Sequence, residues 1–367
     1  MRLRLLPVAR GSVTLPDGGG RSNAATRLAR PDPAAGQQDQ EDRVPDASID
    51  AAPPSGPQEA PAWFVRALAC SPEEGETTVD GVRIHHLAWG QRDRPTLVLV
   101  HGGAAHARWW AALAPLLAVD RRVVALDLSG HGDSGRRAVY PVTTWVDEVL
   151  AVAEAAGGSG RPVVAGHSMG GFVTIVAAAT RGPDLEGAIV LDAPVRRPDP
   201  ESAEGRDGRM FRAPKTYPDL ETAVAHFHLV PSQPTVNPWI VDQVARDSLR
   251  EGPDGWTWRF DPRVFTRREG PSRPSEFGPE LARAACRIAI VNGQRSAIVD
   301  DDVRAYTAEL LAGSPAAAAG VPVIEVPEAH HHLLLDQPLA TVTALRAVLS
   351  AWAPIGAPPV PVLADDP

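Results

Sequence analysis

One short segment of the sequence, GHSMGG at residues 166–171, has residue types and spacing that fit nucleophilic catalysis. It follows an apolar run, RPVVA, and precedes a helix-like stretch, FVTIVAAAT. A G-x-S-x-G pattern at a strand-to-helix turn predicts that the hydroxyl of Ser168 is held above a sheet as a nucleophile. Glycines flank such a serine because the turn is sharp and neighbouring strands lie close. The alternative is an ordinary glycine-rich turn with no chemical role.

A serine hydroxyl needs a neighbouring base to become a nucleophile. Near the C-terminal end, EAHHHLLLDQP at residues 328–338 places three adjacent histidines after an apolar run. Three histidines also suggest a metal site. However, consecutive residues of one short loop cannot all point at one ion, and no carboxylate or cysteine cluster accompanies them. We therefore expect a general base in this loop, and neither a metal nor a cofactor.

Apolar runs alternate with helical patterns around these motifs. TTVDG and VRIHHLAW indicate a hairpin joined at Asp80-Gly81. Further strands are expected in TLVLVHGG, RVVALDLSG, RPVVAGH, GAIVLDAP, CRIAIVNG and PVIEVPEA, with helices near residues 107–119, 141–156, 301–311 and 337–352. Strand–helix alternation of this kind predicts an α/β fold, with a mostly parallel sheet and helices on both of its faces.

The alternation fails in three regions. Residues 1–62 contain no Phe, Trp or Tyr, so we expect a disordered N-terminal segment, and residues 353–367 predict a disordered tail. The core then comprises residues 63–194 and 281–352. Between them, residues 195–280 form an insertion that we interpret as a lid or cap. Nine aromatic residues lie in it: Phe211, Tyr217, Phe227, Trp239, Trp256, Trp258, Phe260, Phe265 and Phe277.

The composition narrows the class of protein. A net charge of −9 argues against a nucleic-acid partner held by phosphate contacts. The two cysteines, Cys70 and Cys286, form no metal-ligand pair or disulfide framework, which fits a reduced, cytoplasmic setting. No apolar run is long enough to predict a membrane span. We expect a small-molecule substrate as the partner, and the oligomeric state stays open.

Three motifs, HGGAAHARWW, DLSGHGDS and GHSMGG, make the stretch from about Trp63 to Trp352 resemble the α/β-hydrolase fold family. The resemblance is to its lid-bearing branch of haloalkane dehalogenase-like and epoxide hydrolase-like proteins, and it implies an eight-stranded, mostly parallel sheet. The family's last motif has a histidine seven residues before a proline, and counting back from Pro338 gives His331 as the base. If that register is off by one, the base is His330.

The resemblance also implies two donors for an oxyanion hole, the backbone N–H groups of Met169 and Gly103. A glycine at position 103 lets a substrate approach the backbone closely, although a simple strand-terminating turn explains it equally well. The motif DLSGHGDS, residues 127–134, matches a loop that we expect to be mainly structural and to shape the edge of the pocket.

The acid departs from the family pattern. The family usually places it where this sequence has Ser296, in the run Gly293-Gln-Arg-Ser. Part of the family places it one strand earlier, which corresponds to Asp192. A carboxylate there would fix the tautomer of the histidine. The alternatives are a carboxylate among Asp300–Asp302, or no carboxylate at all, with Asp192 only capping its turn.

Relatives in this branch that cleave carbon–halogen bonds or epoxides use an aspartate nucleophile, so Ser168 excludes both reactions. Acyl transfer to water remains, and it predicts a serine hydrolase that cleaves an ester or lactone of a small, largely apolar substrate through an acyl-enzyme. One alternative is hydrolysis of a carbon–carbon bond next to a ketone, as in meta-cleavage-product hydrolases. The other is a non-enzymatic small-molecule receptor of the same fold.

Overall fold

The computed structural model describes residues 2–5, 59–199 and 215–353. By contacts the chain divides into two units, Met1–Val8 with Pro57–Pro367, and Ala9–Gly56. The second unit, residues 200–214 and residues 354–367 lie outside the described residues. Most of the predicted N-terminal segment, nearly all of the predicted tail and Phe211 therefore lie there too.

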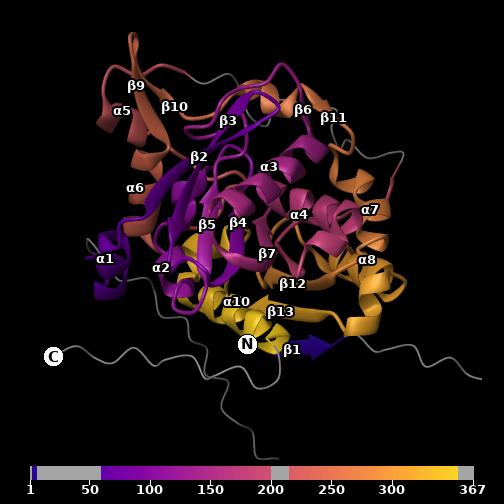
Figure 1. Cartoon of the computed structure of the whole chain (residues 1–367). Helices are drawn as coiled ribbons and strands as arrows, with labels where there is room; N and C mark the ends of the chain where they lie inside the picture. Colours follow the sequence, from indigo (N-terminus) through magenta and orange to yellow (C-terminus); the bar gives the residue numbers. More distant parts are fainter. Residues whose placement is uncertain (1, 6–58, 200–214, 354–367) are drawn as a thin grey trace, which may run out of the picture. The chain divides into compact units, whose positions relative to one another are not determined.

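A nine-stranded sheet runs through the first unit in the order β1-β13-β12-β8-β7-β4-β5-β3-β2 (Figure 1). The bounds are β1 Arg2–Leu5, β2 Glu73–Val79, β3 Val82–Trp89, β4 Pro95–Val100, β5 Arg122–Leu126, β7 Ser159–His167, β8 Gly187–Leu191, β12 Arg287–Gly293 and β13 Pro322–Val326. The six strands from β5 to β13 pair in parallel, whereas β3 is antiparallel to both β5 and β2. The expected mostly parallel, eight-stranded sheet is therefore confirmed in β2 to β13.

The ninth strand, β1, lies within residues 1–62, which we expected to be disordered. β1 pairs antiparallel with β13, with Arg2 opposite Glu325 and Leu5 opposite Pro322. An edge strand presents a row of unpaired backbone N–H and C=O groups, which any extended segment can satisfy. Because this pairing uses backbone groups and does not depend on side-chain type, a strand can form in a segment that contains no aromatic residues.

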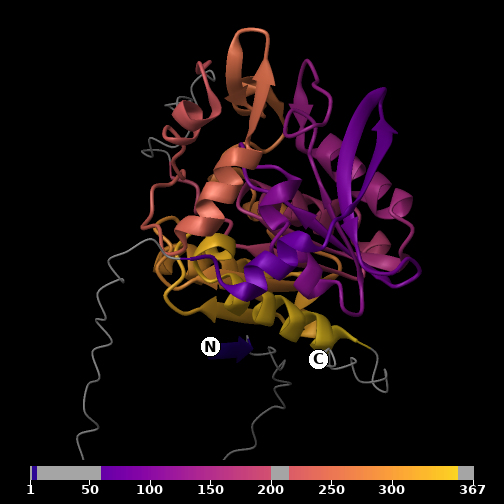
Figure 2. The same cartoon turned by 90° about the vertical axis from the view of Figure 1, so that its left-hand side faces the viewer.

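Helices cover both faces of the sheet, as expected (Figures 1 and 2). One apolar cluster joins the sheet to α3, α4, α7 and neighbouring residues, and a second joins the opposite face to α2, α10 and the segment around α1. The bounds are α1 Ala62–Ala69, α2 Ala114–Leu117, α3 Val142–Ala155, α4 Met169–Thr180, α7 Gly278–Ala282, α8 Asp301–Ala312, α9 Leu333–Asp336 and α10 Pro338–Trp352. None of the described helices is both long and apolar enough to cross a bilayer.

Local turn chemistry explains where the elements begin and end. The β2–β3 hairpin turns at Asp80 and Gly81, whose φ values of 48° and 75° are the left-handed ones that a two-residue hairpin requires. The single helix expected at residues 107–119 is instead two pieces, a 3₁₀-helix at Ala107–Trp110 and the short α2. Pro115 near the start of α2 has no N–H with which to continue a helix from the preceding turn.

Helix α4 packs unusually close to β4. A Cβ on Gly170 would lie 2.5 Å from the carbonyl oxygen of Val100, and one on Gly166 would lie 2.1 Å from the carbonyl oxygen of Gly170. Side chains at these two positions would push the helix away from the sheet. The two glycines therefore bring the first turn of α4 next to the carboxyl end of β4.

The connection from β8 to β12 contains the insertion, residues 195–280, in place of a single crossover helix. Its described elements include α5 Leu220–Val224, α6 Pro238–Asp247, the β9–β10 hairpin (Leu249–Gly252 and Gly255–Trp258) and β11 Arg268–Glu269, which pairs with β6 Tyr140–Pro141. Gln233 of the insertion accepts a hydrogen bond from the backbone N–H of His332 at 2.8 Å. The insertion thus contacts the histidine loop directly.

Candidate active site

Ser168 lies on the sharp turn between β7 and α4. Its backbone angles, φ 55° and ψ −116°, are strained for a residue with a side chain. Its N–H donates to the carbonyl of Leu191 on β8 at 2.9 Å, and its carbonyl accepts from Gly171 and Phe172 in the first turn of α4. The surrounding backbone therefore holds the strained turn, and Ser168 stays partly exposed.

Three predicted residues from distant parts of the sequence form one hydrogen-bonded chain. Ser168 Oγ lies 3.1 Å from His331 Nε2, and His331 Nδ1 lies 2.7 Å from Asp192 Oδ2. His331 is 2% exposed and Asp192 is 0% exposed. Because a carboxylate only accepts, Nδ1–H of His331 donates to Asp192, which leaves Nε2 as the acceptor for the hydroxyl of Ser168.

Asp192 follows directly after β8 and also has a left-handed φ of 48°. Its Oδ1 accepts from the backbone N–H of Gly293 at the end of β12, at 2.9 Å. Its Oδ2 accepts from Ser296 Oγ at 2.6 Å, in addition to His331. The neighbouring strands β8 and β12 thus hold the carboxylate on one side, while the histidine meets it on the other.

The other candidate acids do not reach His331. Asp300 caps α8 and accepts from the N–H of Val303 at 2.9 Å. Asp301 is paired with Arg304 at the surface, and Asp302 lies 3.6 Å from Arg197. The geometry therefore assembles Asp192 with the histidine and leaves the later carboxylates outside.

His330 also lies away from Ser168. Its backbone N–H donates to Asp336 Oδ2 at 2.8 Å, and its Nδ1 lies 2.9 Å from the same oxygen. Asp336 lies in the same loop, five residues after His331. It fixes the loop at His330, so that the next residue, His331, faces the serine.

The two predicted oxyanion donors lie side by side. Met169 is the first residue of α4, so its N–H has no partner within the helix. A Cβ on Gly103 would lie 3.8 Å from Met169 Sδ and 3.0 Å from the ring of Phe265 in the insertion. A Cβ on Gly102 would lie 3.4 Å from that of Ser168. The β4 loop and the start of α4 therefore frame the serine.

Arg268, which the sequence reasoning missed, places a positive charge beside Met169. Its Nη2 lies 3.2 Å from Met169 Sδ, and its guanidinium lies 5.6 Å from the ring centre of Phe265. Among the described residues it makes no ion pair, and burial lowers its pKa to about 10. No sequence motif marks it, because its importance arises only when β11 pairs with β6. A cation here favours negative charge near the two predicted oxyanion donors.

His331 lies in a cluster with two other histidines. Three histidines lie close together: one ring nitrogen from each of His167, His331 and His332 lies within 4.8 Å of the other two. Two of the three adjacent histidines of the loop therefore do converge, and the third member of the cluster is His167, not His330. His167 Nε2 donates to the carbonyl of His331 at 2.9 Å. Both ring nitrogens of His331 face Ser168 and Asp192. Burial lowers the pKa of His332 to about 3, so that this neighbour stays uncharged. The contacts favour support of His331 over metal binding.

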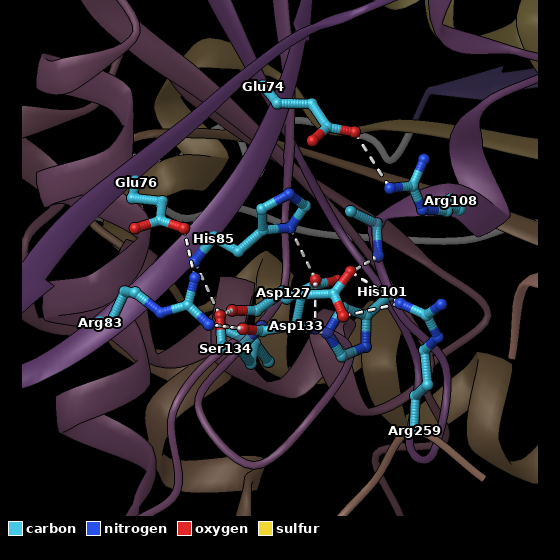
Figure 3. Close-up of polar contacts among 12 residues, drawn as sticks. Glu74, Glu76, Arg83, His85, His101, Arg108, Asp127, Asp133, Ser134 and Arg259 are labelled. Atoms are coloured by element: carbon cyan, nitrogen blue, oxygen red, sulfur yellow. Dashed lines mark hydrogen bonds and ion pairs between the residues drawn. The ribbon is translucent and has the colours of Figure 1, made fainter. Parts of the chain in front are cut away.

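The polar network around Asp127 positions the β4 and β5 loops (Figure 3). Its Oδ1 accepts from the N–H of Ala107 at 2.7 Å, and its Oδ2 accepts from that of Asp133 at 2.9 Å and pairs with His85 Nδ1 at 2.8 Å. Arg259 of the insertion pairs with Asp133 at 2.6 Å. The network connects β3, β5 and the insertion, which fits the structural role expected of this loop.

The comparisons with known proteins identify the family of the chain. A family model described as the alpha/beta hydrolase family matches residues 97–345, well over half of the chain. The chain belongs to the alpha/beta hydrolase family. Its matched segment runs from β4 to within α10, and so includes the turn at Ser168, the insertion and the histidine loop.

Individual relatives of this alpha/beta hydrolase cover smaller parts. Protein phosphatase methylesterase 1 of Mus musculus is 34% identical over 158 residues, 41% of this chain and 40% of that protein. Epoxide hydrolase 4 of Mus musculus is 29% identical over 117 residues, 31% of this chain and 32% of that protein. The chain therefore spans less than half the length of either relative. The second match agrees with the expected haloalkane dehalogenase and epoxide hydrolase-like branch.

Among solved structures, that of E-2-(acetamidomethylene)succinate hydrolase is similar over 76% of this chain and 99% of that chain. The TM-score is 0.62 and the sequence identity is 17%. At this identity the likeness shows the fold.

The Asp127 network predicts a pH-dependent contribution to stability. Burial alone would raise the pKa of Asp127, but hydrogen bonds, first among them that from His85, hold it well below its usual range. A lowered pKa stabilises the fold fully above the unfolded value of about 3.9, and the contribution is lost progressively as the pH falls from there through the lowered pKa of the folded protein. We expect Asp127→Asn to lower the free energy of unfolding at pH 7 by about 2 kcal/mol or more.

This difference should shrink between about pH 5 and pH 3, measured by chemical denaturation of both proteins across that range. Asp147→Asn is the control, because it removes only an exposed ion pair with Arg181 and should cost little at any pH. A difference for Asp127→Asn that is the same at pH 7 and pH 3 would contradict the proposed role of its charge.

Proposed function

We propose that this protein is a serine hydrolase that cleaves an ester or lactone of a small, largely apolar substrate through an acyl-enzyme. The observation that carries the proposal is the chain of contacts from Ser168 Oγ to His331 Nε2 at 3.1 Å and from His331 Nδ1 to Asp192 Oδ2 at 2.7 Å. Membership of the alpha/beta hydrolase family and the similarity to a methylesterase support it.

In the proposed acylation step, Ser168 Oγ attacks the carbonyl carbon and its proton passes to His331 Nε2. The charge on Asp192 stabilises the imidazolium that forms. The N–H groups of Gly103 and Met169 receive the negative oxygen of the tetrahedral intermediate. The intermediate then collapses, the bond to the alcohol oxygen breaks, and the alcohol leaves with the proton from Nε2.

Deacylation repeats these steps with water as the nucleophile. His331 Nε2 takes a proton from the water, whose oxygen attacks the carbonyl carbon of the acyl-enzyme. The second tetrahedral intermediate releases Ser168, which regains its proton from Nε2, and the carboxylic acid product leaves. No redox step or cofactor is needed for this sequence.

A carbon–carbon hydrolase of the meta-cleavage-product type and a non-enzymatic receptor remain the alternative functions. A carbon–carbon hydrolase would act on a ketone whose leaving group is carbon and would turn over simple esters slowly. A receptor would bind its ligand without turnover, and Ser168→Ala would leave that binding intact. A panel of esters, lactones and vinylogous diketones therefore separates the three classes.

The insertion supplies the argument for an apolar substrate. Phe265 lies against Gly103, while Phe227 lies 6.4 Å from Trp109, whose ring in turn lies 5.7 Å from His332. Apolar side chains of the insertion thus approach the site from two sides. Most other aromatic residues of the insertion have structural contacts instead, as in the stack of Phe277 on Phe172 at 4.2 Å. We propose that the insertion acts as a lid that sets specificity.

The first prediction from this proposal concerns the nucleophile and base. A fluorophosphonate should label the protein once, at Ser168, and turnover of a p-nitrophenyl ester should disappear in Ser168→Ala. His331→Ala should lower turnover on the order of 10⁴-fold or more, because the members of such a triad act as a unit. The neighbouring control His330→Ala should retain most of the activity. Labelling that persists in Ser168→Ala would refute the assignment.

The second prediction concerns the acid. Asp192→Asn keeps the shape of the side chain but stabilises the wrong tautomer of His331, so kcat should fall by up to roughly 10⁴-fold while the fold persists. Asp301→Asn is the matched control, since its carboxylate is exposed and paired with Arg304. A near-normal kcat in Asp192→Asn together with a large loss of kcat in Asp301→Asn would contradict this assignment and indicate that the acid lies in the later loop.

The third prediction concerns the substrate. If the insertion covers an apolar site, kcat/KM should rise along p-nitrophenyl esters from acetate to hexanoate, by up to about 0.8 kcal/mol for each buried methylene. Phe265→Ala should flatten the rise, whereas Trp256→Ala, a change in the β9–β10 hairpin, should leave it unchanged. A flat or falling series in the wild type would instead indicate a short-chain or polar substrate.

A further inference from the structure

Ser296 occupies the position where the family usually has its acid, and in this protein it contacts the acid from the preceding strand. Its Oγ lies 2.6 Å from Asp192 Oδ2, the oxygen that also accepts from His331 Nδ1 at 2.7 Å. The hydroxyl of Ser296 and the ring of His331 therefore donate to the same buried carboxylate oxygen, and each bond weakens the other. A hydroxyl placed there affects the acid directly, without touching the nucleophile.

The direction of this hydrogen bond follows from the other contacts of the hydroxyl. Ser296 Oγ accepts from the backbone N–H of Val299 at 3.2 Å and, more weakly, from that of Ile298 at 3.4 Å. With its lone pairs facing these two N–H groups, the hydroxyl proton points at Asp192, which as a carboxylate can only accept. The two N–H donors also polarise the hydroxyl and make it a better donor.

The loop around Ser296 is fixed by further contacts. Its backbone N–H donates to the carbonyl of Gly293 at 3.2 Å, and Arg295 donates its N–H to the carbonyl of Ala329 in the histidine loop at 2.8 Å. The N–H of Gly293 in turn donates to Asp192 Oδ1 at 2.9 Å. The same short turn therefore holds both oxygens of the acid and a backbone atom two residues before His331.

We propose that Ser296 is a positioning residue that replaces the usual acid of this strand with a hydrogen-bond donor, which orients Asp192 and sets how strongly its carboxylate accepts from His331. This inference rests on the proposed function. It requires that Asp192, held by Gly293 and Ser296, is the acid of a working triad. A neutral serine at position 296 leaves Asp192 as the single charged group at this point. A carboxylate in the same place would repel that of Asp192.

The test compares Ser296→Ala, which removes the hydroxyl, with Ser296→Thr, which keeps it. We expect kcat for a p-nitrophenyl ester to fall roughly tenfold in Ser296→Ala with KM unchanged, the size of one hydrogen bond to a charged group. Ser296→Thr should restore most of kcat. Ser314→Ala is the control, because it removes a serine hydroxyl that donates only to the Leu311 carbonyl at the far end of α8.

A second measurement makes the inference independent of turnover. The low-field NMR resonance of the His331 Nδ1–H proton, identified by its absence in His331→Gln, reports the strength of the bond to Asp192. We expect it to shift in Ser296→Ala and to stay in place in Ser314→Ala. A wild-type protein without Ser168-dependent turnover would refute the proposed function, whereas this resonance would still report whether Ser296 acts on the acid.

A third arm moves the acid to the position usual in the family. Asp192→Gly removes the carboxylate, suits the left-handed backbone there and leaves space beside His331. Adding Ser296→Asp should then recover at least tenfold of the lost kcat. Unchanged kcat and an unshifted resonance in Ser296→Ala would overturn the proposal, as would a lower melting temperature with normal kcat, which indicates a purely structural serine.

Discussion

The buried carboxylate of Asp192 is the group on which the site depends most. It is 0% exposed and accepts hydrogen bonds from the backbone of Gly293, the hydroxyl of Ser296 and the ring of His331. A buried charge is tolerated only when it is hydrogen-bonded. The carboxylate of Asp192 therefore needs these three donors to stay charged at this buried position. They come from the β12 end and the histidine loop, and they bring the last third of the chain to the turn at Ser168.

The parallel sheet provides the geometry for this convergence. The carboxyl ends of β4, β7, β8, β12 and β13 share one edge, and each delivers a residue or loop to the site. Close packing at Gly166 and Gly170 then sets the first turn of α4 against β4, so that Ser168 lies beside the predicted oxyanion donors. The insertion contributes Phe265, which lies against Gly103, and Gln233, which accepts a hydrogen bond from the histidine loop.

The elements with strong local signals could be predicted from the sequence. Glycines at fixed spacing around Ser168 indicate a sharp turn, and the resemblance to the family's last motif, counted back from Pro338, implies which of the three histidines meets the serine. Asp192 was one of several alternatives, because its reach to His331 depends on β8 lying next to β12, a long-range pairing that local pattern does not encode. The same limit hid the contact of Ser296, the pairing of β1 with β13 and the approach of Arg268 to Met169.

The central claim is that Ser168 becomes acylated during turnover. Rapid acid quenching of the enzyme during hydrolysis of a p-nitrophenyl ester, followed by peptide mass spectrometry, tests it directly. The account predicts that the peptide containing Ser168 gains the mass of the acyl group, and that the adduct disappears as substrate is exhausted. Turnover with an unmodified Ser168 peptide at every time point, or a stable adduct on a different residue, would contradict it.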